Sequence, residues 1–170
     1  MWMRQYIAQE TSTNNVWLGC NFQDEIFEDY TPIILLRDPV ERWISGCPDE
    51  AGVLHLINDT KKLDHYFDYI ADMCRDEHHS PQSDFIAGLD RSKAVFFYCD
   101  QDLTANVHHY FESMSFATQP PGPVNQQAEA LKPYSSAWRE ILKNSKYLEK
   151  FRQNFARDYE LINSVNFYAR

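Results

Sequence analysis

The hydrophobic residues of this chain fall into short continuous runs and into longer segments where they recur at helical spacing. Residues 32–36 (PIILL) form one such run and are followed at once by polar residues. A run of this kind is typical of a strand that is buried on both faces, as in a parallel sheet. Residues 94–99 (AVFFYC) have the same pattern, and residues 16–22 form a shorter candidate. We therefore predict two buried strands and a third, short one.

Helical spacing of apolar residues predicts helices between and after these strands. In the segment 63–74, Leu63, Phe67 and Ile70 lie on one stripe. Further helices are expected at residues 1–10, 38–47, 103–116 and 134–163, the last with a break near residues 144–145. Strands that alternate with helices predict an α/β fold with a mainly parallel sheet. The proline-rich connector at 119–124 is too short to mark a domain boundary, so we expect residues 1–170 to form a single domain.

The composition is that of a globular protein with a negative net charge. Hydrophobic residues make up 44% and charged residues 24% of the 170 residues, which suits a packed core and argues against intrinsic disorder. The net charge of −9 disfavours nucleic acid and long polyanionic glycans as partners, because clustered Lys and Arg hold such ligands. A small anionic ligand is still compatible, since two or three cationic side chains make a local pocket.

The cysteines and the first residues of the chain indicate the compartment. No two of the four cysteines form a CxxC pair, and all lie in or beside apolar segments: Cys20, Cys47, Cys74 and Cys99. This favours buried free thiols in a reducing compartment over a zinc site or a disulfide framework. The first ten residues lack the apolar stretch of a signal peptide, and no segment has the roughly 20 apolar residues that span a bilayer. We expect a soluble, cytoplasmic protein with no membrane partner.

One segment combines a predicted strand with residues that suit an anionic ligand. Arg37 directly follows the strand, and ligands of α/β sheets bind beyond the carboxyl ends of the strands. Its guanidinium group can hold a phosphate through two hydrogen bonds. Asp38 and Pro39 are typical of the N-cap and first residue of a helix, on which Arg42 and Ser45 share a face. Ser45 can donate to the same phosphate, and Arg42 is expected to pair with Asp38. The spacing alone fits an ordinary capped helix equally well.

The segment RDPVERWIS resembles the motif with which PAPS-dependent sulfotransferases bind the 3′-phosphate of their nucleotide, strand–RDPxxRxxS–helix. The resemblance implies that Arg37 and Ser45 bind this phosphate. It also implies a three-layer, P-loop-like sulfotransferase fold. The implied reaction transfers a sulfuryl group from the co-substrate PAPS to a hydroxyl acceptor, such as a carbohydrate, and releases PAP. No metal ion is required.

Two weaker similarities extend along the chain. Residues 78–85 (HHSPQSDF) resemble the H-x-x-P-Q segment of the Golgi-type carbohydrate sulfotransferases. The region from Asn125 to Leu161 resembles the C-terminal helices of the family, which end in a D-Y-x-L-like pattern, here with Asp158 and Tyr159. Asn125 falls where the family often has a polar residue near the nucleotide, so it is a further candidate for nucleotide binding.

The chain departs from the family in two respects. The family begins with a strand and a P-loop-like turn whose amides and Lys bind the 5′-phosphosulfate, but no Gly-rich loop or GK[ST] sequence occurs here. The first lysine is Lys61, so we expect the first strand and the catalytic loop, the main electrostatic catalyst, to be missing. The second departure concerns the general base. Cys20, in LGCNF, stands where a G-H-x-x-F pattern would place a histidine, and Asp24 or Glu25 could act instead.

Three other functions fit parts of the sequence. A non-catalytic domain derived from a sulfotransferase would bind PAP without turnover. A kinase would need a P-loop Lys and an acidic Mg²⁺ ligand, and neither is visible. A structural remnant would form a homodimer that covers the sheet edge left by the missing strand. His78 and His79, beside Asp76 and Glu77, suit a solvated loop better than a metal site, so no metal is expected.

Overall fold

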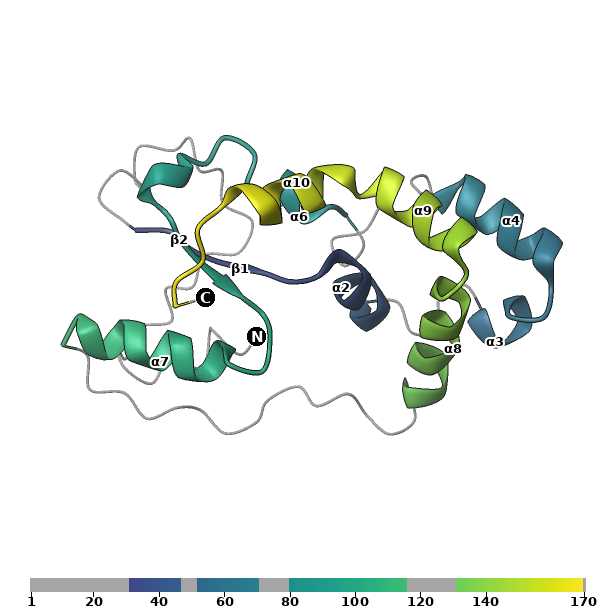
Figure 1. Cartoon of the computed structure of the whole chain (residues 1–170), viewed down its shortest axis with the longest axis horizontal. Coiled ribbons are helices and arrows are strands. Elements are labelled where there is room, and N and C mark those ends of the chain that lie inside the picture. Colours follow the sequence, from purple (N-terminus) through teal and green to yellow (C-terminus); the bar gives the residue numbers. More distant parts are fainter. Residues whose placement is uncertain (1–30, 47–51, 71–79, 116–130, 170) are drawn as a thin grey trace. The chain divides into compact units, whose positions relative to one another are not determined.

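The computed structural model describes residues 31–46, 52–70, 80–115 and 131–169 (Figure 1). These residues are mostly helical and include a two-stranded parallel sheet, which confirms the α/β class in this coarse form. The chain divides into two compact units. The strand unit comprises Met1–Arg37, Phe85–Gln126 and Val165–Arg170, and the helical unit comprises Asp38–Asp84 and Gln127–Ser164. The single domain over residues 1–170 stays a prediction.

The described strands of the strand unit are the two that the apolar runs predict. β1 (Ile33–Leu36) pairs in parallel with β2 (Val95–Tyr98), in register from end to end. The amide of Cys99 extends this ladder by donating to the carbonyl of Leu36 at 2.7 Å. Both phenylalanines of β2 are buried, whereas in β1 only Leu36 is, so burial of β1 is less complete than expected. An apolar run predicts that a strand is shielded, but not how far each face is covered. The strand predicted at residues 16–22 lies outside the described residues.

A helix and a C-terminal residue pack against β2. α7 (Leu103–Ser113) lies against Phe97, and the short 3₁₀ helix η2 (Arg91–Lys93) precedes the strand. The ring of Tyr168 also contacts Phe97, with centroids 5.5 Å apart. Its amide donates to the carbonyl of Phe96 at 2.8 Å. Segments that are far apart in the sequence thus build one aromatic core in this unit.

The described part of the helical unit consists of α2 (Pro39–Gly46), α3 (Val53–Leu56), α4 (Thr60–Asp68), α8 (Lys132–Leu142), α9 (Ser145–Asn154) and α10 (Ala156–Ser164), with α6 (Gln82–Phe85) at its border. α9 lies beside α4 (Figure 1). Two ion pairs join these helices, Lys146 with Asp64 at 2.5 Å and Lys150 with Asp68.

Polar residues at the helix starts explain several of the boundaries. The side chain of Asn144 accepts a hydrogen bond from the amide of Lys146 at 3.0 Å, which confirms the predicted break near residues 144–145. A second break at Phe155 separates α9 from α10, so this region has three helices instead of the one or two predicted. The helix predicted from residue 63 starts earlier, at Thr60, because Asp59 caps it.

Trp43 lies in the core of the helical unit. Its side chain has no exposed surface. The ring centroids of Trp138 and Phe151 lie 4.7 and 5.7 Å away, both in edge-to-face geometry, and that of Tyr66 lies 6.3 Å away. Trp43 is therefore a core residue of this unit. Because Trp43 and its neighbour Ile44 are both buried, α2 is fixed in its rotation about its own axis.

Candidate functional site

The RDPVERWIS segment has the local structure that its sequence predicts. β1 ends at Leu36, and α2 begins at Pro39. The side chain of Asp38 accepts a hydrogen bond from the amide of Glu41 at 3.0 Å, and its carbonyl accepts one from the amide of Arg42 at 2.9 Å. Asp38 is thus the N-cap of α2, as expected.

Arg37 lies at the carboxyl end of β1, in the same unit as Cys99. Burial raises the pKa of the Cys99 thiol to about 11, and the positive charge of Arg37 opposes this increase only in part. A thiol with such a pKa is protonated at neutral pH, so Cys99 is a poor nucleophile. Arg37 thus places a positive charge at this sheet end, close enough to act on Cys99, and it is half-buried.

Ser45 is exposed on α2. Its hydroxyl donates to the carbonyl of Glu41 at 2.7 Å, one helical turn earlier. Serine commonly makes this hydrogen bond within helices. The bond is easily replaced by one to another acceptor, because the hydroxyl can rotate. Ser45 can therefore turn its hydroxyl to a phosphate oxygen without any change in the helix.

Arg42 contacts a distant part of the helical unit. Its Nη1 donates to the carbonyl of Ser80 at 2.7 Å, across 38 positions of sequence. Ser80 begins the short segment at residues 80–83, which we call the 80–83 turn. The predicted side-chain pair between Arg42 and Asp38 stays a prediction. Sequence reasoning missed the contact with Ser80, since local spacing does not connect residues so far apart.

Asp158 is a buried carboxylate in the first turn of α10, with 1% of its surface exposed. Its Oδ2 accepts a hydrogen bond from the amide of Gln82, and its Oδ1 accepts one from the amide of Ser83, both at 2.9 Å. These are the first amides of α6, which have no partner within their own helix. The preceding residue, Pro81, has no side chain that can cap them. Asp158 therefore caps α6 from 76 positions away in the sequence.

A surface ion pair joins α2 to α8 within the helical unit. Both carboxylate oxygens of Glu41 accept hydrogen bonds from Arg139 on α8, at 2.8 and 3.1 Å. This bidentate pairing raises the pKa of Arg139. Because both side chains are more than a third exposed, we expect the pair to add less than about 1 kcal/mol to stability.

No family model, curated protein or solved structure matches the chain. The resemblance to PAPS-dependent sulfotransferases therefore depends on the sequence motifs, above all on residues 37–45.

The structure describes both residues that are predicted to bind the phosphate, but it does not describe several other predicted site residues. Arg37 is the last residue of the first segment of the strand unit, and Ser45 belongs to the helical unit. Six candidates lie outside the described residues, and their roles stay predictions. They are the general-base candidates Cys20, Asp24 and Glu25, the nucleotide-binding candidate Asn125, and the pair His78 and His79.

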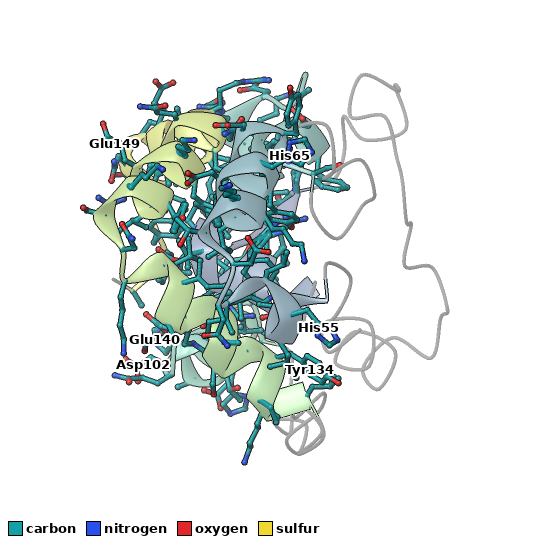
Figure 2. All side chains as sticks on the ribbon, turned by 90° about the vertical axis from the view of Figure 1, so that its right-hand side faces the viewer. His55, His65, Asp102, Tyr134, Glu140 and Glu149 are labelled. Carbon is teal, nitrogen blue, oxygen red and sulfur yellow. The ribbon has the colours of Figure 1, made fainter. Side chains whose placement is uncertain are left out.

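Within the described residues, no group of three or more His, Cys, Asp or Glu side chains is arranged to hold a metal ion. His55 on α3 and His65 on α4 are exposed (Figure 2). A ring nitrogen of His109 lies 3.0 Å from the hydroxyl of Tyr168 in the strand unit. In the same parts of the chain, no helix has the length and apolar character needed to cross a bilayer.

Proposed function

We propose that the chain is a sulfotransferase-like protein that binds the 3′-phosphate of PAPS or PAP through Arg37 and Ser45. The observation that carries the proposal is the RDPVERWIS segment, in which every fixed position of strand–RDPxxRxxS–helix is present. Its local structure supports the proposal, since Arg37 directly follows β1, a strand with a parallel neighbour, and the aspartate-capped helix α2 begins two residues later. The proposed fold is the three-layer, P-loop-like sulfotransferase fold, of which β1 and β2 would form part.

The two side chains have complementary tasks in this proposal. Arg37 supplies a permanent positive charge and two parallel N–H donors, which match two oxygens of a phosphate. Ser45 gives up its hydrogen bond to the Glu41 carbonyl, and its hydroxyl donates a hydrogen bond to a third phosphate oxygen. Because both contacts are made to the 3′-phosphate, a nucleotide without this group should lose most of the binding energy.

The proposed reaction is transfer of the sulfuryl group of PAPS to a hydroxyl acceptor, such as one of a carbohydrate. A base removes the proton of the acceptor hydroxyl, its oxygen bonds to sulfur, and the bond from sulfur to the 5′-phosphate oxygen breaks, so that PAP leaves. Cys20, Asp24 and Glu25 are the candidates for the base.

The second candidate function is binding of PAP without turnover. The sequence contains no Gly-rich loop with a GK[ST] sequence, and its first lysine, Lys61, is an exposed residue of α4. Both functions predict the same nucleotide contacts. Incubation with PAPS and hydroxyl acceptors separates them, since only the enzyme releases PAP faster than the buffer does.

Calorimetric titration with PAP tests the nucleotide contacts directly. We expect micromolar binding by the wild-type chain and at least roughly tenfold weaker binding by Arg37→Ala and by Ser45→Ala, since a hydrogen bond to a charged group contributes about 1.5–3 kcal/mol. Arg91→Ala, which removes an exposed arginine of the same unit as Arg37, is the matched control. Adenosine 5′-monophosphate, which lacks the 3′-phosphate, is the ligand control. Absence of PAP binding, or equal binding of both nucleotides, would show that the proposal is wrong.

A further inference from the structure

The 80–83 turn is held at one end by a buried charge. Asp158 has 1% of its surface exposed, and both of its oxygens accept amide hydrogen bonds from Gln82 and Ser83. A buried carboxylate is costly unless its hydrogen bonds are satisfied. The two bonds at 2.9 Å satisfy it, and they also define where the start of α6 lies relative to α10. This end of the turn is therefore firmly placed.

The other end of the turn is held by the helix that carries the proposed phosphate ligand. Arg42 donates to the carbonyl of Ser80 through a short, charge-assisted hydrogen bond of 2.7 Å. Arg42 and Ser45 are three residues apart on α2, which has only eight residues and is anchored in the core by Trp43. A restraint on Ser45 is thus also a restraint on Arg42, because both belong to one short, rigid helix.

We propose that Arg42 and Asp158 are positioning residues that couple the 80–83 turn to phosphate binding on α2. The inference rests on the proposed function, since Ser45 must contact the phosphate. A ligand that reduces the motion of α2 then reduces the motion of the turn through the bond from Arg42 to Ser80. Asp158 fixes the far end, so the turn has no freedom to follow α2 by moving as a whole. Coupling of this kind is reciprocal, and loosening the turn weakens binding of the phosphate by the same factor.

Hydrogen exchange of the Gln82 and Ser83 amides, measured by NMR, tests two points. It shows whether Arg42 and Asp158 hold the 80–83 turn, and whether the turn is coupled to phosphate binding. In the ligand-free protein, we expect these amides to exchange about tenfold faster in Arg42→Ala than in the wild type, the change that loss of one hydrogen bond to a charged group allows. Arg42→Lys keeps a donor and should restore part of the protection. Arg139→Ala is the matched control, because it also removes an arginine contact to α2, at Glu41, but leaves the turn untouched.

The role of Asp158 is tested with a variant that preserves its shape. Asp158→Asn keeps one acceptor oxygen, so one of the two amides should stay protected while the other exchanges about tenfold faster. Equal acceleration of every amide in the helical unit would mean that the variant is only less stable overall, and would overturn the positioning role of Asp158.

Addition of PAP then tests the coupling. PAP should slow exchange of both amides in the wild type and in Arg139→Ala, but not in Arg42→Ala. Unchanged exchange in ligand-free Arg42→Ala would show that Arg42 does not hold the 80–83 turn, whatever the effect of PAP. Equal protection by PAP in Arg42→Ala and wild type would overturn the coupling. If the wild type binds no PAP, the proposed function and the coupling both fail, while exchange in the ligand-free protein still decides whether Arg42 and Asp158 hold the turn.

Discussion

Replacement of Asp158 by alanine should destabilise the protein strongly. The substitution leaves the amides of Gln82 and Ser83 without an acceptor at a site where the wild-type side chain is 1% exposed. A buried donor without a partner costs roughly 1–3 kcal/mol, so two of them cost about 2–6 kcal/mol. Removal of a buried charge offsets part of this loss. We therefore expect a decrease of about 3 kcal/mol in the free energy of unfolding, a large fraction of the roughly 5–15 kcal/mol typical of a domain.

Two further variants separate the buried cap from general effects of charge. Asp158→Asn keeps one acceptor and should lose about half as much stability. Asp84→Asn removes a carboxylate that belongs to α6 itself, whose ion pair with Arg157 at 3.0 Å is exposed, and should cost less than about 1 kcal/mol. Urea unfolding followed by tryptophan fluorescence gives all three values. Equal midpoints and slopes for Asp158→Ala and Asp84→Asn would refute the reasoning, since the two carboxylates would then be equivalent.

The core and the thiol at the sheet end give two more predictions. Trp43→Ala should lower the free energy of unfolding by about 3–5 kcal/mol, because it empties the space between Trp138 and Phe151; a loss below about 1 kcal/mol in urea unfolding would contradict the described core. Alkylation of Cys99 by iodoacetamide, followed by peptide mass spectrometry, should be about 100-fold slower in the native than in the unfolded protein near pH 8, since its pKa is raised from 9.0 to about 11. The native rate should keep rising tenfold per pH unit through pH 9, and Arg37→Ala should lower it further. A native rate that levels off near pH 9 would be inconsistent with the raised pKa. Because the folded state holds this proton to higher pH than the unfolded state, its contribution to stability is present below pH 9 and is lost between pH 9 and about 11.

Local sequence signals predicted the elements around the candidate site well. The apolar runs gave β1 and β2, and the pairing is parallel as expected. Asp38 before Pro39 marked the start of α2, and Asn144 marked the start of α9. In each case a backbone strand or cap is decided by residues within about four positions, so the pattern contains the necessary information.

Contacts between distant positions could not be predicted in the same way. The carboxylate that caps α6 comes from Asp158, and a capping rule that examines only neighbouring residues finds just Pro81 there. Arg42 has a local candidate partner in Asp38, so local spacing does not indicate a partner as distant as Ser80. The boundary of α9 and α10 at Phe155 was missed because apolar periodicity continues across it. These features depend on how helices meet, which periodicity alone does not encode.

The contact of Tyr168 with β2 has a consequence for the order in which the chain can fold. The amide of Tyr168 donates a hydrogen bond to the carbonyl of Phe96, 72 positions earlier. β1 and its partner β2 are separated by some 60 residues, which include half of the helical unit. During synthesis, β1 therefore leaves the ribosome long before β2, and Tyr168 follows only after α10. Closing such long loops is entropically costly and slow. The amides of the strand unit should therefore become protected from hydrogen exchange late, after the helices of the helical unit have formed their local hydrogen bonds.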